Sequence, residues 1–261
     1  MSRGECELRC LNLVRNSLEN EAIYYAMDMS DCNQIKSMFL SAVSNSKSSQ
    51  FPDFLCNLGF IEHFQISSGK TTKKGSLHKE AIAKFNSGFE TGLEKFKNET
   101  ECRGVDSGQS YSQIIEYSGH SYDNLVNSLQ KTFKHHIDSF HKYRGNKNIG
   151  VFLIEYNEMA MSMIEDCYVD VHEMRIGDLH KQEHFNDYRL SRDKAMLDFI
   201  YEYRNDIQYV VYLCKTAIEI ISVNHIPNLK SLLPWEYRIA PNHTIERRAV
   251  YKINIPNQID T

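Results

Sequence analysis

Apolar residues recur at intervals of three and four along much of the chain, and this spacing predicts amphipathic helices. The clearest apolar stripe lies in residues 122–143, where Leu125, Leu129, Phe133, Ile137 and Phe140 share one side and Gly145 follows the end. The same spacing predicts helices over residues 6–27, 32–43, 78–97, 159–167 and 190–205.

Shorter apolar runs between these helices predict β-strands. The run VFLIEY at residues 151–156 is continuous, which is typical of a strand covered on both faces. Further strands are expected at residues 60–67, 207–213, 217–223 and 249–255, after a short extended piece at 52–54. Residues 98–119, rich in glycine and serine, indicate an irregular surface excursion. The chain is therefore expected to form an α/β fold, a mixed sheet of about five or six strands flanked by helices.

The composition is that of a globular protein. With 261 residues, 41% hydrophobic and 25% charged, the chain suits a single domain, with a core at residues 31–156 and a C-terminal elaboration at 157–261. No run approaches the roughly 18 apolar residues that a membrane span needs, so no membrane association is expected. The first residues, MSRGECELRC, lack the apolar core of a signal peptide.

The cysteines indicate the redox environment of the protein, and the net charge limits how it could bind nucleic acid. The seven cysteines are scattered and form no CxxC pair, which favours reduced thiols and a cytoplasmic location. The net charge of −4 excludes a uniformly basic protein, so any contact with nucleic acid must use a local basic patch.

Two acidic residues at neighbouring apolar runs are the leading candidates for chemistry. Asp53 follows Pro52, and Glu62 interrupts the apolar face formed by Phe60, Phe64 and Ile66. Mg²⁺ and Mn²⁺ prefer oxygen ligands, and two carboxylates on adjacent strands can supply them. The alternative is that Asp53 is a turn residue and Glu62 points to solvent from an edge strand.

The arrangement around this pair resembles the PD-(D/E)XK nuclease superfamily, which has the restriction-endonuclease-like fold. The resemblance covers residues 31–156 and lies in Pro52-Asp53, then Glu62 on an apolar strand, a basic element, a helix and the later strand VFLIEY. It implies an αβββαβ core and Mg²⁺-dependent cleavage of phosphodiester bonds. Asp53 is then the first metal ligand and Glu62 the second.

The chain departs from the family pattern at the lysine expected two residues after the second acid. Phe64 occupies that position, on the same strand face as Glu62. Gln65 is the nearest polar residue, and it shares the other face with His63. Lys70 or Lys74 in the basic loop are candidates for the missing role, and the alternative is that catalysis has been lost. Glu155, at the end of VFLIEY, is a candidate third ligand or a cap for the next helix.

Residues 131–147, KTFKHHIDSFHKYRGNK, form a basic segment on the predicted helix 122–143. Lys131, Lys134, Lys142 and Arg144 are candidates to contact nucleic-acid phosphates. The alternative is a solvated helix face opposite the apolar stripe. No helix-turn-helix, zinc-finger or RNP pattern is present in the sequence, so base-specific recognition is not indicated.

These observations lead to two hypotheses of function. The first is a metal-dependent nuclease, or a nuclease-like DNA-processing protein of restriction or phage-defence type. The second is a non-catalytic module that binds nucleic acid or protein on the same fold. A weaker third option is a subunit that needs a protein partner or a second copy of itself, because Trp235, Tyr237 and Tyr251 provide an aromatic C-terminal surface.

Overall fold

The structure is a computed structural model of the chain, and it divides into two compact units. It describes residues 3–45, 50–72, 75–103, 110–116, 119–158, 160–168, 179–232, 236–241 and 244–250. The first unit is Met1–Ser68 with Ser121–Pro241, and the second is Gly69–His120 with Asn242–Thr261. The sequence alone suggests one domain, whereas the chain leaves the first unit after Ser68 and returns to it at Ser121.

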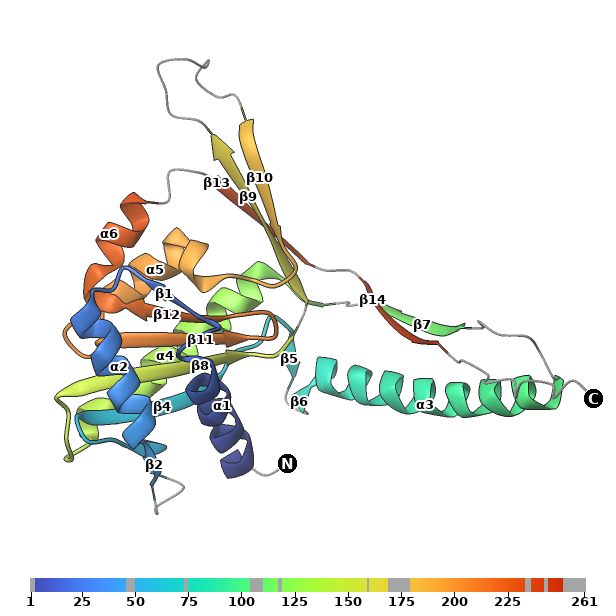
Figure 1. Cartoon of the computed structure of the whole chain (residues 1–261), viewed down its shortest axis with the longest axis horizontal. Coiled ribbons are helices and arrows are strands. Elements are labelled where there is room, and N and C mark those ends of the chain that lie inside the picture. Colours follow the sequence, from blue (N-terminus) through green and yellow to red (C-terminus); the bar gives the residue numbers. More distant parts are fainter. Residues whose placement is uncertain are drawn as a thin grey trace, which may run out of the picture. The chain divides into compact units, whose positions relative to one another are not determined.

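The first unit is built on a mixed seven-stranded sheet in the order β1-β12-β11-β8-β4-β3-β2 (Figure 1). Its strands are β1 (Ala22–Tyr25), β2 (Val43–Ser44), β3 (Phe54–Leu55), β4 (Gly59–Gln65), β8 (Ile149–Tyr156), β11 (Tyr209–Cys214) and β12 (Ile218–Ser222). The pairs β4–β8, β8–β11 and β1–β12 are parallel, and the others are antiparallel. This confirms the expected α/β class and mixed sheet. Two strands of the sheet, β11 and β12, lie beyond residue 156.

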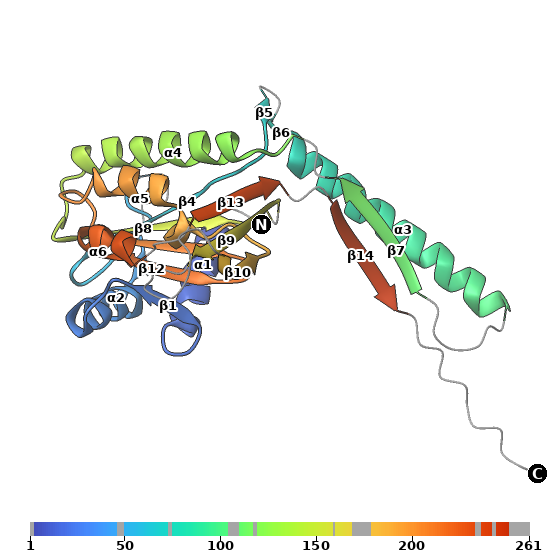
Figure 2. The same ribbon diagram turned by 90° about the horizontal axis from the view of Figure 1, so that it is seen from above.

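Helices cover both faces of this sheet (Figure 2). On one face, α1 (Arg3–Ser17) and α2 (Met29–Ser41) pack on Ile61, Val151 and Leu153. On the other face, the core joins strand residues such as Phe60 and Phe152 to three helices, α4 (Tyr122–Lys142), α5 (Lys194–Tyr201) and α6 (Ile226–Ser231). The strands therefore bury alternate residues against different helices. Among the described helices, none combines the length and apolar character needed to cross a membrane.

Strands β4 and β8 approach each other closely where they begin. A Cβ atom on Gly59 would lie 1.9 Å from the carbonyl oxygen of Ile149, so only glycine fits there. From that point the parallel register runs to the pair Gln65 and Glu155. Because Gly59 has no side chain, β4 and β8 can pair closely from their first residues. In this register Gln65 lies beside Glu155 at the other end of the two strands.

The local apolar patterns predict several elements correctly. Helix α4 and strand β8 match the expected ranges within two residues, and all five residues of the α4 stripe are buried. Two patterns are misleading. The spacing predicts one helix over 6–27, but α1 ends at Ser17 and β1 follows, because Ala22–Tyr25 pairs with β12.

The predicted helix over 159–167 is also wrong, because this stretch contains β9 (Met161–Tyr168). It forms a three-stranded sheet with β10 (Leu179–Phe185) and β13 (Glu236–Pro241). The predicted helix over 190–205 is shorter. Leu190–Arg192 forms a 3-10 turn, and α5 begins after Asp193, whose side chain accepts a hydrogen bond from the Met196 N–H.

The second unit contains a helix and two small sheets. Its elements are β5 (Thr71–Thr72), β6 (Gly75–Ser76), α3 (Leu77–Arg103), β7 (Ser110–Glu116) and β14 (Thr244–Val250). Strand β7 pairs with β14, so residues 98–119, expected to be irregular, contain the end of α3 and a strand. Residues 251–255 of the predicted final strand lie outside the described part of the chain, whereas its beginning belongs to β14.

Candidate functional site

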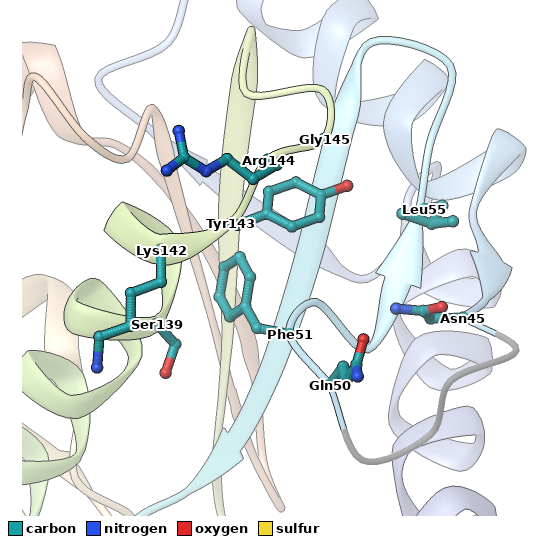
Figure 3. A pocket seen from close by; sticks show the side chains of 9 residues that line it. All are labelled: Asn45, Gln50, Phe51, Leu55, Ser139, Lys142, Tyr143, Arg144 and Gly145. Carbon is teal, nitrogen blue, oxygen red and sulfur yellow. The ribbon is translucent and has the colours of Figure 1, made fainter.

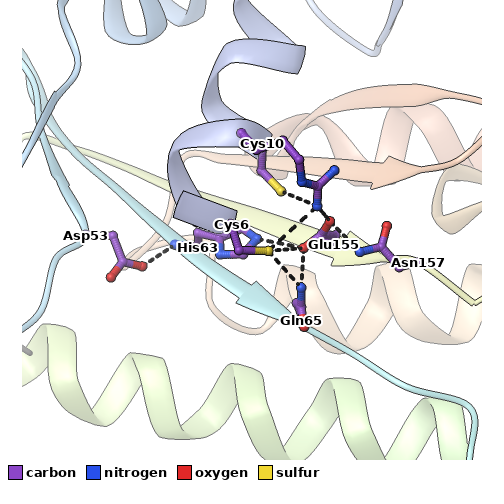
Figure 4. A network of polar contacts seen from close by, with 8 residues as sticks. Cys6, Cys10, Asp53, His63, Gln65, Glu155 and Asn157 are labelled. Atoms are coloured by element: carbon purple, nitrogen blue, oxygen red, sulfur yellow. Dashed lines mark hydrogen bonds and ion pairs between the residues drawn. The ribbon is translucent and has the colours of Figure 1, made fainter. Parts of the chain in front are cut away.

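A network of polar side chains surrounds the carboxylate of Glu155 on the sheet face that α1 covers (Figure 4). Glu155 is fully buried. Its Oε2 accepts a hydrogen bond from Gln65 Nε2 at 2.5 Å and lies 3.2 Å from His63 Nε2. Its Oε1 accepts a hydrogen bond from Asn157 Nδ2 at 2.6 Å. Two adjacent parallel strands therefore converge on one acidic group.

Helix α1 adds two thiols and a cation to this network. Cys6, Arg9 and Cys10 are three and four positions apart, so they share one side of the helix. The Arg9 guanidinium forms an ion pair with Glu155, and the Cys6 thiol lies 3.7 Å from Glu155 Oε2. The packing of Leu11 and other apolar residues of α1 on the sheet holds these groups in place.

The surroundings shift the protonation of these groups in opposite directions. Burial alone would raise the pKa of Glu155, but hydrogen bonds from His63, Gln65 and Arg9 hold that pKa well below its usual value. Burial raises the pKa of the Cys10 thiol, and the nearby Glu155 charge raises it further. Near neutral pH, Glu155 is therefore a carboxylate and Cys10 a neutral thiol.

A second group of ligand atoms lies beside this network. Glu7 of α1, Asp53 before β3 and His63 of β4 each offer one ligand atom, and the three atoms lie within 4.8 Å of one another. All three residues are buried. Asp53 Oδ2 accepts a hydrogen bond from the His63 backbone N–H at 2.9 Å, which fixes the carboxylate against β4. Two carboxylates and an imidazole can hold a divalent cation.

Glu62 turns toward α4, on the other side of β4. Its Oε1 lies 2.7 Å from His136 Nδ1, and its Oε2 accepts a hydrogen bond from the Asp53 N–H at 2.9 Å. The His136 ring stacks on Phe64, with ring centroids 4.7 Å apart. Among the described residues, Glu62 belongs to neither group of three ligand atoms. The carboxylate at Asp53 is thus joined by Glu7 and His63 instead.

The other candidates for catalysis are Gln65, Lys70 and Lys74, and only Gln65 lies in the Glu155 network. Gln65 shares the face of His63, as strand alternation predicts, and reaches Glu155. Lys70 is exposed and belongs to the second unit, and Lys74 lies outside the described residues. Sequence reasoning missed Glu7, because the apolar stripe of α1 marks a buried face without showing which strand it covers.

The basic candidates lie along α4 and the turn that follows it. Lys131, Lys134, Lys142 and Arg144 are all exposed, and α4 covers the sheet face opposite α1. An open hollow of about 720 Å³ lies beside the end of α4 (Figure 3). Its lining combines basic, aromatic and amide side chains: Lys142, Arg144, Phe51, Tyr143, Asn45 and Gln50.

A smaller hollow of about 440 Å³ borders the Glu155 network. It is lined by Arg9 and Asn157, which both contact Glu155, and by Lys215 in the turn between β11 and β12. This hollow provides space for a ligand beside Arg9 and Asn157. Scans of protein-family models, curated proteins and solved structures each found no match to the chain. The function is therefore argued from the residues themselves.

Proposed function

We propose that the protein is a metal-dependent phosphodiesterase of nuclease type, with Mg²⁺ or Mn²⁺ held by Glu7, Asp53 and His63. The observation that carries this proposal is the buried meeting of these three ligand atoms from a helix, a loop and a strand. Two hard oxygen ligands and one imidazole suit Mn²⁺ and Mg²⁺ better than they suit a thiophilic metal. Two carboxylates brought together in a largely buried site also carry a cost that a cation offsets.

The order of the elements supports the same proposal. Helix α2, strands β2 to β4, helix α4 and strand β8 occur in the order αβββαβ, with Gly69–His120 of the second unit inserted before α4. Strands β2, β3, β4 and β8 are neighbours in the sheet. In the resemblance to PD-(D/E)XK nucleases, the second acid and the lysine are two residues apart on one strand face. Here His63 and Gln65 have that spacing on the face of Asp53.

Each polar group has a role in this proposal. Glu7 and Asp53 bind the cation, which when bound polarises a phosphate oxygen and lowers the pKa of a coordinated water. Glu155 orients the His63 ring through the contact at Nε2. Arg9 and Lys215, beside the smaller hollow, supply positive charge for a phosphate. We include DNA processing of restriction or defence type in the proposal, with nucleic acid as the partner.

The direct test is cleavage of DNA and RNA, single- and double-stranded, with Mg²⁺ or Mn²⁺ supplied. We expect wild-type cleavage to fall by at least about a hundredfold in Glu7→Gln and Asp53→Asn, because each removes a metal ligand. Glu19→Gln is the matched control, since Glu19 is an exposed acid that pairs with Lys36. Absence of cleavage by the wild type on every substrate with both ions would contradict the proposal.

A second candidate function is a non-catalytic module that binds nucleic acid or protein. The observation that favours it is Phe64, which stands where the family has its lysine and packs into the core. Calorimetry separates the two functions. Binding of nucleic acid without any binding of Mn²⁺ favours the module, and loss of Mn²⁺ binding in Asp53→Asn favours the enzyme.

A further inference from the structure

One nitrogen of Arg9 lies among three side chains of types that commonly bind metals. Nη2 is 3.7 Å from Cys6 Sγ and 3.5 Å from Cys10 Sγ, and it also forms the ion pair with Glu155 Oε1. The ligand atoms of Cys6, Cys10 and Glu155 all lie within 4.8 Å of one another. A positive charge therefore stands between two sulfurs and a carboxylate.

The donors and their spacing match a thiophilic cation better than they match a guanidinium. Zinc takes four ligands in a tetrahedron, with Zn–S bonds of about 2.3 Å, so its ligand atoms stand about 3.3 to 3.8 Å apart. Two cysteines four positions apart on a helix direct both sulfurs to one point. His63 Nε2 lies 3.2 Å from Glu155 Oε2, at the edge of this group. By contrast, sulfur is a weak acceptor for the Arg9 N–H groups.

We propose that Cys6, Cys10 and Glu155 form a binding site for Zn²⁺ or a similarly thiophilic divalent cation. These three ligands leave one position of the zinc open, and the Arg9 guanidinium occupies the place of the ion when it is absent. This site is distinct from the one formed by Glu7 and Asp53, because its ligands include two thiolates. The two sites meet at the contact between His63 and Glu155.

Exchange of Arg9 for the ion is physically straightforward. The Arg9 side chain is 37% exposed, and it borders the hollow of about 440 Å³, so its head group has space to move outward. Zinc binding releases the two thiol protons, since only thiolates bind the metal. Two thiolates and a carboxylate then supply the negative charge that holds Zn²⁺ in place of the guanidinium.

Cobalt spectroscopy of the reduced full-length chain tests this site. Co²⁺ bound by thiolates gives a sulfur-to-metal charge-transfer band. Zinc displaces the Co²⁺ ion, and the loss of the band measures the zinc affinity. We expect one equivalent of zinc and a band that weakens in Cys10→Ser and in the less buried variant Cys6→Ser, and that disappears when both cysteines are replaced. Zinc affinity should fall by at least about a hundredfold, since even the hydrogen-bond partners of ligands contribute about ten- to a hundredfold. Cys32→Ser, at a thiol outside this group, should leave the band unchanged.

Arg9→Met provides the sharpest test. Removing the competing cation should tighten zinc binding by about tenfold, because the ion then no longer displaces an ion pair. Tighter binding supports the exchange. A wild type without the charge-transfer band, or a band that persists when both cysteines are replaced, would overturn the site. Weaker zinc binding by Arg9→Met would contradict the proposal that the ion and the Arg9 guanidinium occupy the same position.

The zinc site and the proposed nuclease site fail independently. Asp53→Asn should retain the thiolate band, because Asp53 is not among the zinc ligands. If nuclease activity is absent and the band is present, only the proposed function is refuted. If cleavage depends on Asp53 and the band is absent, only the zinc site is refuted.

Discussion

Oε1 of Glu62 lies 2.7 Å from Nδ1 of His136, so this buried acid is paired with helix α4. The imidazole stacks on Phe64, and the carboxylate also accepts the Asp53 N–H. An acid on an apolar strand face is thus stabilised by a helix on the same side of the sheet. The pairing explains why Glu62 is structurally required without being part of the candidate metal site.

Replacing His136 should destabilise the first unit strongly. His136→Ala removes the partner of a buried carboxylate, and we expect the free energy of unfolding to fall by about 3 kcal/mol. His135→Ala is the matched control, because His135 is exposed on the same helix, and it should change stability by less than about 0.5 kcal/mol. Urea unfolding followed by circular dichroism measures both. Equal effects would show that the Glu62–His136 pair contributes nothing.

Manganese should stabilise the fold through Glu7 and Asp53 but not through Glu62. At a Mn²⁺ concentration of about 100 times Kd, ligand binding adds about 2.7 kcal/mol to the free energy of unfolding. Glu7→Gln and Asp53→Asn should lose this gain, whereas Glu62→Gln should keep it. Thermal unfolding with and without Mn²⁺ provides the measurement. If only Glu62→Gln lost the stabilisation by Mn²⁺, Glu62 would be a metal ligand, as first expected from the sequence.

The exposed bases at the end of α4 should set the salt dependence of nucleic-acid binding. Each phosphate contact contributes about 0.7 to 0.9 to the slope of log K against log salt concentration. Replacing both Lys142 and Arg144 by Ala should therefore reduce the slope by about 1.5. Lys36→Ala, on α2 at the opposite face, is the control. An unchanged slope in the double variant would place the contact surface elsewhere.

Two glycines of α3 should respond in opposite ways to alanine. A Cβ atom on Gly92 would lie 1.9 Å from the Tyr111 hydroxyl oxygen, whereas one on Gly88 meets only Gln113 at 4.0 Å. Gly88→Ala should stabilise the helix by up to about 1 kcal/mol, because alanine has the higher helix propensity. Gly92→Ala should destabilise the second unit, because Tyr111 must leave its contacts with Phe89 and Phe96. Thermal melts of the two variants should shift in opposite directions.

Glu219 should make stability depend on pH. It is fully buried on β12 and accepts hydrogen bonds from the Ser191 N–H and hydroxyl, yet burial raises its pKa. A raised pKa in the folded state means that the stability present below the unfolded pKa is lost as pH rises through the folded value.

The matched comparison is Glu219→Gln, which stays neutral at every pH. Its stability relative to the wild type should increase from pH 4.5, the ordinary pKa of glutamate, toward neutral pH. Urea midpoints measured across this range provide the test. Parallel pH profiles for the two proteins would contradict a raised pKa at Glu219.

The elements that were predicted correctly are those in which the spacing of apolar residues within the element is enough to identify it. Helix α4 has a regular stripe from Leu125 to Phe140, and β8 is apolar throughout, so each reveals its burial without reference to a partner. Strands β1 and β9 were not predicted, because their strand character comes from pairing with β12 and with β10 and β13. Their own residues fit a helix equally well.

The site shows the same division. The sequence singles out Asp53, and whether this residue binds a metal stays a prediction. The sequence could not show whether Glu62 or Glu7 lies on its side of the sheet, since that depends on which helix packs on which face of β4. Strand alternation did predict correctly that His63 and Gln65 act on the same side. The proximity of Cys6 and Cys10 to Glu155 appears only when α1 lies against the end of β8.

The pairing of β7 with β14 has a consequence for how the chain is made. Strand β7 leaves the ribosome before α4, β8 and β11, and its partner is synthesised after all of them. Strand β7 therefore has an unpaired edge while the following residues of the first unit are synthesised. A pause in translation between β13 and β14 would prolong that exposure and favour chaperone capture of the nascent insert.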